Sequence, residues 1–333
     1  MSSFASRLPL ALSTLVVAAS TGACGPLLLD PDDVEFRESI GCANCGPNSP
    51  WVNDTPIQNV RLSGLPNEDG VSLLGLRPNA AAPLHTVTTD SREDLVAVLD
   101  GTVIASGAGL VGWQLVFEHE NELVITWISA YDPAVPLLAD EGRPMTTYAI
   151  RFPSTHGSAA SGFASACPTF LTSPDEPLIT VIRGETYDSV EKKVDDVDAD
   201  WITLACADEA AYKTKRLGYG PMSALGPNFP AFDVDARDAT LKMLTADYCG
   251  TGMSFTEQNH GIYYVDAAET VTVYEENVQL TEALWTAEGA LCLDYPRLFE
   301  REKVMAACPL PYCGALGPGE LAGAVWLSGM PPY

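Results

Sequence analysis

Nine cysteines, the first of them directly behind an apolar leader, constrain this chain more than any other feature of its sequence. Residues 1–23 contain one base, Arg7, then the apolar run 8–19 and four small residues, after which comes Cys24. This order is typical of a secretory signal peptide. The run is shorter than the ~20 apolar residues that a membrane-spanning helix needs. We therefore expect export, with residues 1–23 as a signal peptide.

The small residues before Cys24 also resemble the signal of bacterial lipoproteins, in which the cysteine is acylated and becomes the first residue of the mature chain. The match departs at Thr21, where leucine is commonest in those signals. Each buried methylene contributes ~0.8 kcal/mol to membrane binding, so several acyl chains anchor a protein durably. Gly25, rather than an aspartate, follows the cysteine. We expect a lipid anchor at Cys24 that holds the chain in the bacterial outer membrane or at the cell surface; plain secretory cleavage is the alternative.

The other eight cysteines are even in number, which in an exported chain predicts up to four disulfides. Eight cysteines allow about a hundred pairings, and sequence alone cannot rank them. A zinc site built from Cys42, Cys45 and the Cys308/Cys313 pair is the alternative, although export favours oxidation. The disulfide candidates are Cys42, Cys45, Cys167, Cys206, Cys249, Cys292, Cys308 and Cys313.

Acidic residues outnumber basic ones by 44 to 18, which gives a formal net charge of −26. Such a charge repels phosphate backbones, so we expect no nucleic-acid partner. Hydrophobic residues make up 47% of the 333 residues and charged ones 19%, so the chain can bury one large or two modest cores.

We predict a predominantly β, α+β protein, with an antiparallel β-rich N-terminal domain followed by a disulfide-linked α+β domain. Short apolar runs between Gly and Pro turns predict strands, among them a hairpin of 110–117 and 122–128 with a four-residue loop. The clearest helix is predicted at 236–249, capped by Asp235 and stopped by Gly250. The expected parts are a signal peptide (1–23), a tether (24–50), a β-rich domain (51–152), a linker (153–164), the α+β domain (165–316) and an irregular tail (317–333).

The end of that helix resembles a known motif. Residues 245–250 read Thr-Ala-Asp-Tyr-Cys-Gly and are similar to the motif of the ADYC-domain family of predicted lipoproteins from myxobacteria and their relatives. Segments 205–221 and 285–297 also resemble stretches of that family, so the resemblance covers about 165–315. It implies no particular activity. The motif residues are Ala246, Asp247, Tyr248, Cys249 and Gly250.

Each side chain of the motif has an expected place. Tyr248 falls on the apolar stripe of the helix, so its ring should pack in the core with the hydroxyl bonded, and Cys249 should link the helix to a strand or loop. Asp247 lies near a helix C-terminus, where the dipole disfavours a carboxylate by roughly 0.3–1 kcal/mol. It therefore needs a partner, either a loop amide or an arginine such as Arg297; a ligand or metal contact is the alternative.

The sequence shows no pattern of a known catalytic site. The histidines His85, His119, His156 and His260 lack the spacing of a zinc peptidase, and neither a Gly-x-Ser-x-Gly elbow nor a phosphate-binding loop occurs. We therefore predict no catalytic residue.

Calcium is the one cofactor that the sequence suggests. Asp196, Asp198 and Asp200 match the first ligands of a calcium loop, but Trp201 replaces the required glycine and Ala207 the bidentate glutamate. A solvated acidic turn is the alternative, with no metal bound.

These observations favour a non-catalytic module of the cell envelope or surface, with a structural or ligand-binding role and a protein or glycan as its ligand. The alternative is an extracytoplasmic hydrolase that acts through paired carboxylates, whose required separation is spatial and cannot be read from sequence. A pocket enclosing two or more carboxylates with raised pKa would favour the enzyme.

Overall fold

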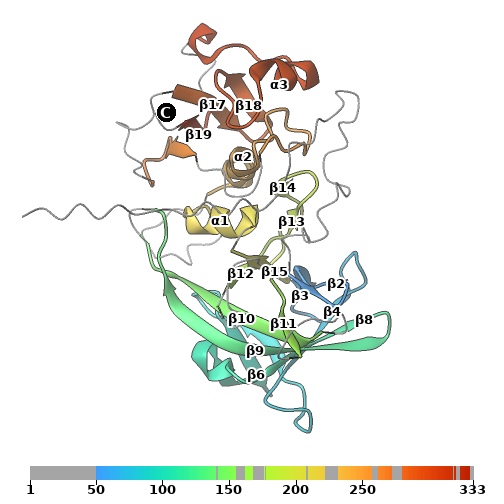
Figure 1. The fold of residues 1–333 in the computed structure, drawn as a ribbon. Coiled ribbons are helices and arrows are strands. Elements are labelled where there is room, and N and C mark those ends of the chain that lie inside the picture. The colour runs from blue at the N-terminus through green and yellow to red at the C-terminus, as the bar shows by residue number, and fades with distance from the viewer. Residues whose placement is uncertain are drawn as a thin grey trace, which may run out of the picture. The chain divides into compact units, whose positions relative to one another are not determined.

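The computed structural model describes most of the chain beyond the tether (Figure 1). The signal peptide, Cys24, Cys42 and Cys45 lie outside the described residues, so their predictions stay predictions. The described residues are 50–139, 142–154, 162–167, 176, 178–207, 209–221, 232–256, 262–271, 280–317, 319 and 323–330.

An antiparallel sheet of eight strands forms the first part of the structure (Figure 1). In order across the sheet the strands are β3 (Asn59–Arg61), β15 (Trp201–Cys206), β12 (Ile179–Arg183), β10 (Met145–Pro153), β9 (Glu122–Val135), β8 (Gln114–His119) and β4 (Ser72–Arg77). The eighth strand, β11 (Phe163–Ser165), pairs with one end of β10. The antiparallel pairing confirms the predicted β-rich fold.

The β8–β9 hairpin shows how local sequence sets the register of this sheet. Glu120 and Asn121 join the two strands with φ of 54° and 65°, the left-handed values that a two-residue hairpin turn needs to match the twist of the strands. Val116 then lies opposite Ile125. The predicted hairpin is confirmed, with a tighter turn than the predicted four-residue loop.

The apolar side chains of this sheet and the strands beside it form one core. Leu115, Phe117 and Leu204 are fully buried within it, and burying such a side chain stabilises the fold by about 1.5–3 kcal/mol. The shorter elements around the sheet are β1 (Trp51–Val52), β2 (Thr55–Pro56), β5 (Thr86–Thr89), β6 (Leu95–Leu99), β7 (Thr102–Ser106), the 3-10 turn η1 (Gly107–Leu110), β13 (Tyr187–Asp188) and β14 (Lys193–Val194).

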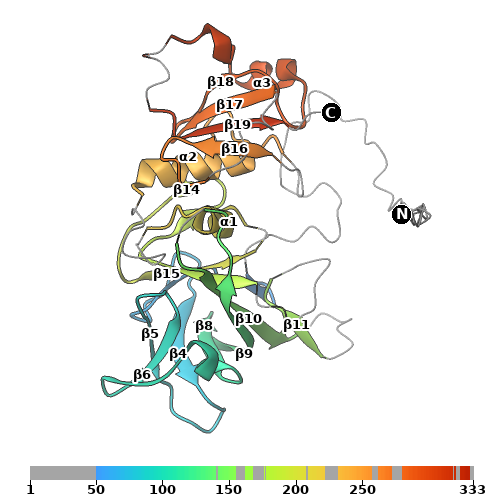
Figure 2. The ribbon, with the colours of Figure 1, turned by 90° about the vertical axis from the view of Figure 1, so that its left-hand side faces the viewer.

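The second part combines helices with a four-stranded antiparallel sheet. Helix α1 (Ala210–Arg216) contacts β12 and β15, whereas α2 (Val234–Thr245) contacts the smaller sheet, so the two helices lie between the sheets (Figure 2). No helix in the described residues is both long and apolar enough to cross a bilayer. The sheet order is β16 (Tyr263–Asp266), β19 (Trp326–Met330), β17 (Leu280–Thr286) and β18 (Gly289–Leu293); α3 (Arg301–Ala307) and the turn η4 (Cys313–Ala315) follow β18 in the chain.

Two predicted boundaries differ from the structure. Strands β12 and β15 come after the predicted linker 153–164, yet they continue the first sheet. The predicted irregular tail 317–333 contains β19, which pairs with β16 on one side and β17 on the other. Trp326 and Ser328 of this inner strand are buried. Both errors have one cause: backbone pairing joins strands that are distant in sequence, and no local pattern records it.

Helix α2 begins and ends earlier than predicted. Asp233, not Asp235, caps it by accepting a hydrogen bond from the Ala236 amide at 2.9 Å. The helix stops at Thr245 because Ala246 has a left-handed φ of 52°, so Gly250 lies beyond the helix end. The ADYC motif is therefore the turn after the helix rather than its last turn.

Six of the eight disulfide candidates are paired in the structure. Cys167 bonds to Cys206, Cys249 to Cys308 and Cys292 to Cys313, with Cα–Cα distances of 5.7, 5.6 and 4.8 Å. The first pair fastens the segment after β11 to β15 in the large sheet. The other two hold the smaller part, where Cys249, in the motif turn and not in α2 as predicted, bonds to Cys308 at the end of α3. The prediction of disulfides in this region is confirmed.

Candidate functional site

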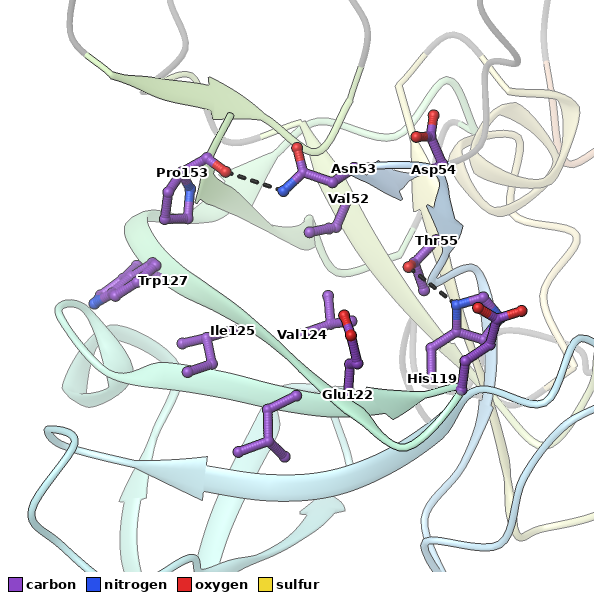
Figure 3. Close-up of a pocket in the computed structure, with 12 residues that line it drawn as sticks. Val52, Asn53, Asp54, Thr55, His119, Glu122, Val124, Ile125, Trp127 and Pro153 are labelled. Carbon is purple, nitrogen blue, oxygen red and sulfur yellow. Dashed lines mark hydrogen bonds between the residues drawn. The ribbon is translucent and has the colours of Figure 1, made fainter. Parts of the chain in front are cut away.

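A groove of about 480 Å³ opens beside β9 (Figure 3). One side is the free end of β9, and the other is the short β1–β2 hairpin together with the end of β10. Its volume lies in the range of about 300–1,000 Å³ that is typical of ligand sites. The lining residues are Val52, Asn53, Asp54, Thr55, His119, Glu120, Glu122, Leu123, Val124, Ile125, Trp127 and Pro153.

The groove exists because the pairing between β9 and β10 does not reach the N-terminal end of β9. The register between them runs as far as Arg151 opposite Trp127. Two residues further along β10 stands Pro153, which has no N–H to donate to a neighbouring strand. Its carbonyl accepts a hydrogen bond from the Asn53 side chain at 3.0 Å instead. In the described part of the chain, no strand pairs with this edge of β9 from Glu122 to Thr126.

The backbone of this free edge points into the groove at alternate residues. The Ile128 amide donates to the Trp113 carbonyl at 3.0 Å, on the side of β8. The direction of N–H and C=O alternates along an antiparallel strand. The backbone N–H and C=O of Val124, four residues before Ile128, therefore also point toward β8. The amides and carbonyls of Leu123 and Ile125 face the opposite way, toward the groove.

Two hydrogen-bonded contacts mark the ends of the groove. At one end Asn53 reaches Pro153, and at the other the Thr55 hydroxyl lies 3.3 Å from Nδ1 of His119 (Figure 3). Trp127 forms part of the apolar wall and packs edge-to-face on Phe163, with ring centroids 5.6 Å apart. The groove is thus a slot of defined length with an apolar wall.

The charges on the groove have one sign. Asp54, Glu120 and Glu122 bring carboxylates to its rim, and none of the lining residues that the structure describes is Lys or Arg. Glu120 and Glu122 are exposed to solvent. The groove therefore combines an acidic rim, apolar side chains and free backbone groups.

The aspartate of the motif is held by a lysine and by loop amides. Asp247 is fully buried and accepts bonds from Lys242 Nζ at 2.8 Å, from the Gly252 amide at 2.7 Å and from the Thr251 amide at 3.1 Å. The expected loop amides are confirmed. The arginine named as the other possible partner, Arg297, pairs with Glu282, and Lys242 supplies the charged partner of Asp247.

The tyrosine of the motif belongs to a buried hydrogen-bonded network. The Tyr248 hydroxyl donates to Glu282, whose carboxylate also binds Arg297 through two nitrogens at 2.7 and 2.9 Å. Ser328 donates to the same carboxylate at 2.6 Å, and Trp285 donates to Ser328. Burial, and next the Glu282 carboxylate, raise the pKa of Tyr248 well above its usual value. The expected buried tyrosine with a bonded hydroxyl is confirmed.

The glycine that ends the motif allows two backbones to touch. A Cβ on Gly250 would lie 1.9 Å from the Glu288 carbonyl oxygen, and φ at Gly250 is +68°. Next to it, the Ala290 amide donates to the Tyr248 carbonyl at 2.9 Å. The motif turn is therefore fixed against the β17–β18 hairpin.

A family model for the ADYC domain matches residues 107–299. The chain belongs to the ADYC-domain family. The match begins inside the region predicted as a separate β-rich domain, so the ADYC domain of this chain includes β8, β9 and β10 as well as the motif turn. No curated protein and no solved structure matches the chain.

The three calcium candidates of the ADYC domain each accept hydrogen bonds from different protein groups. Asp196 accepts from the Trp201 indole at 2.6 Å, and Asp198 accepts from the Asp200 amide at 2.9 Å. Asp200 itself accepts from the amide and hydroxyl of Ser63 at 2.7 and 2.6 Å. Across the described ranges, no three His, Cys, Asp or Glu side chains are arranged to hold a metal ion.

The carboxyl groups with raised pKa lie away from the groove of the ADYC domain. Burial raises the pKa of Glu185 to about 7, although Arg237 and Tyr187 act in the opposite direction. Burial also raises the pKa of Asp238 on α2, against a hydrogen bond from the Val194 amide. Neither residue lines the groove.

Sequence reasoning missed the groove. Of the four histidines, His119 lies in it, His85 packs edge-to-face against Trp113, and His156 and His260 lie outside the described residues. The one signal available was Pro153 at the end of a strong strand, which marks a place where sheet pairing stops. Its effect on β9 depends on a neighbour that only the fold supplies.

Proposed function

We propose that this ADYC-domain protein is an exported, lipid-anchored binding module of the bacterial envelope, which holds its ligand in the groove along β9. The observation that carries the proposal is the edge of β9 that no described strand pairs with, beside a groove of about 480 Å³. A single folded unit thus offers backbone, apolar and charged groups to one ligand.

The disulfides support an address outside the cytoplasm. Such bonds persist in oxidising compartments and are rare where glutathione keeps thiols reduced. Three of them in the described residues agree with the leader at 1–23 and with lipidation at Cys24. The outer membrane or cell surface is the proposed location, and no nucleic acid is expected as a partner because of the net charge of −26.

The distribution of carboxyl groups favours binding over hydrolysis. A hydrolase with paired carboxylates needs a proton donor with a raised pKa in its cleft. Glu185 and Asp238 have raised pKa values, but they contact protein groups at α2 instead of the groove. We therefore propose no catalytic residue, and no cofactor is required for binding.

Export and anchoring are tested by expressing the full-length chain and its Cys24→Ser variant in a Gram-negative host. We expect the parent chain in the membrane fraction with the mass of an acylated protein that starts at Cys24, and the variant in the soluble extract. Parent protein in the cytosol with an intact leader and free thiols would refute the proposed location.

The groove is tested by NMR of the methyl groups of Leu123 and Ile125, with Ile182 in the core as the control. Envelope peptide mixtures and cell-wall fragments are added in turn, and each mixture is analysed for turnover by mass spectrometry. A binding module should show shifts at the groove methyls alone and leave the mixture intact. Turnover that disappears in a Glu120→Gln/Glu122→Gln variant would establish the hydrolase instead.

A further inference from the structure

We infer that the ligand of the groove is an extended, basic peptide segment of a partner protein, which adds to the edge of β9 as a further strand. The inference rests on the proposed function of the groove and specifies its ligand. Strand addition of this kind draws affinity from main-chain hydrogen bonds and specificity from alternate side chains.

The free backbone groups have the spacing of a strand. Leu123 and Ile125 each direct one amide and one carbonyl at the groove, and no described strand pairs with them on that side. Residues two apart on a strand lie about 6.6 Å apart, and a second strand repeats its own groups at that interval. An extended peptide can therefore satisfy both residues at once.

The edge has room for a short peptide. The free segment runs from Glu122 to Thr126 before pairing with β10 begins at Trp127. At about 3.3 Å for each residue, such a segment spans about 16 Å. The contacts of Asn53 with Pro153 and of Thr55 with His119 mark its two ends. A peptide of about five paired residues fits between them, with its ends outside.

The charge of the groove selects the peptide. Asp54, Glu120 and Glu122 lie on the slot, the described lining contains neither Lys nor Arg, and the whole chain carries a net charge of −26. Such a field attracts cations and repels anions before contact. Alternating apolar residues of the peptide can contact Ile125 and Trp127, which share one face of β9, whereas Lys or Arg residues between them lie on the face of Glu122.

The test uses three capped eight-residue peptides with the full-length protein. The first alternates Lys and Val, the second alternates Glu and Val, and the third is the Lys-Val peptide with alternate backbone nitrogens methylated. Fluorescence anisotropy gives the affinities. Amide hydrogen exchange is followed at Leu123 and Ile125, with Val124 as the internal control because it pairs with Phe117 on β8.

We expect the Lys-Val peptide to bind at least about tenfold more tightly than the Glu-Val peptide at low salt, with a smaller difference at high salt because exposed charges are screened. Methylation should weaken binding about tenfold, since it removes the donors of the added strand. The amides of Leu123 and Ile125 should exchange more slowly in the complex, and that of Val124 should not change. Equal binding of the methylated peptide, or unchanged exchange at Leu123 and Ile125, would overturn the inference.

Charge variants provide a matched control. Glu120→Gln/Glu122→Gln should weaken the Lys-Val peptide several-fold, whereas Glu68→Gln/Asp100→Asn removes the same charge from exposed residues outside the groove and should not. If both pairs weaken binding equally, the attraction is general and the inference fails.

The failure of the inference differs from failure of the proposed function. If neutral cell-wall oligosaccharides shift the groove methyls and the Lys-Val peptide does not bind, the proposed binding function stands and the peptide ligand is refuted. Absence of shifts with every peptide and oligosaccharide would refute both.

Discussion

Lys242 and Asp247 form a buried ion pair across the end of α2, with Nζ and Oδ2 2.8 Å apart. The lysine is in the last turn of the helix, where a positive charge is favourable to the dipole, and its ammonium faces a carboxylate that two loop amides also bind. Lys242 Nζ also donates to the Glu191 carbonyl. The aspartate that names the ADYC motif therefore holds the turn to the helix instead of facing a ligand.

Replacing Asp247 by Asn should lower the free energy of unfolding by about 3–5 kcal/mol, because the buried ammonium of Lys242 would lose its counter-charge. Urea unfolding measures the effect. The double variant Lys242→Gln/Asp247→Asn removes both charges, so its loss should be smaller than the sum of the two single losses by at least about 1 kcal/mol. Strict additivity would show that the pair does not act as a unit.

Glu185 gives the fold a pH dependence of stability. Its pKa in the folded protein is about 7, above the usual value of 4.5, so the folded state binds the proton more tightly than the unfolded state does. The protonated Glu185 therefore contributes up to about 3 kcal/mol to the free energy of unfolding. This contribution is fully present below the unfolded pKa and is lost as pH rises through the folded pKa. The wild type should thus lose stability between about pH 5 and pH 8 relative to Glu185→Gln. Parallel curves for the two proteins would contradict this assignment.

Gly250 and Gly70 form a matched pair for testing the close approach at the motif turn. Both have positive φ, +68° and +75°, but a Cβ at Gly70 meets nothing within 4 Å, whereas one at Gly250 lies 1.9 Å from the Glu288 carbonyl oxygen. Gly70→Ala should cost about 1–2 kcal/mol for its backbone conformation alone. Gly250→Ala should cost considerably more, because backbone atoms must move apart. Similar melting temperatures for the two variants would exclude the steric explanation.

Removing the disulfide between Cys167 and Cys206 should destabilise the large sheet. The two residues are 39 apart in sequence, and the loop-entropy estimate for such a link is about 4 kcal/mol. For Cys292 and Cys313, separated by 21 residues, the same estimate is about 3 kcal/mol. Urea unfolding of the two paired Cys→Ala variants tests this order, and reduction of the wild type should cost more than either variant loses.

The sequence predicted most of what depends on neighbouring residues. The β8–β9 hairpin follows from two apolar runs with Glu120 and Asn121 between them, and α2 follows from its apolar stripe, although its cap is Asp233 and not Asp235. Tyr248 was expected in the core and is there. The partner of Asp247 was predicted as a class, a loop amide or an arginine, and the amides were confirmed. Asp247 pairs with Lys242 and not with Arg297 because Arg297 forms an ion pair with Glu282 on β17.

The sequence by itself determined the acidic charge, an even set of cysteines beyond Cys24 and the local strands and helix, since each depends on residue type and short-range spacing; the leader at 1–23 stays a prediction. Tertiary structure alone decided which cysteines pair, that β12 and β15 continue the first sheet, and that β19 lies inside the second. It also decided that Pro153 lies at the end of β10 beside β9, which leaves Leu123 and Ile125 without a described strand on the side away from β8. Backbone hydrogen bonds between distant segments make these choices, and such bonds leave no trace in the order of side chains along one strand.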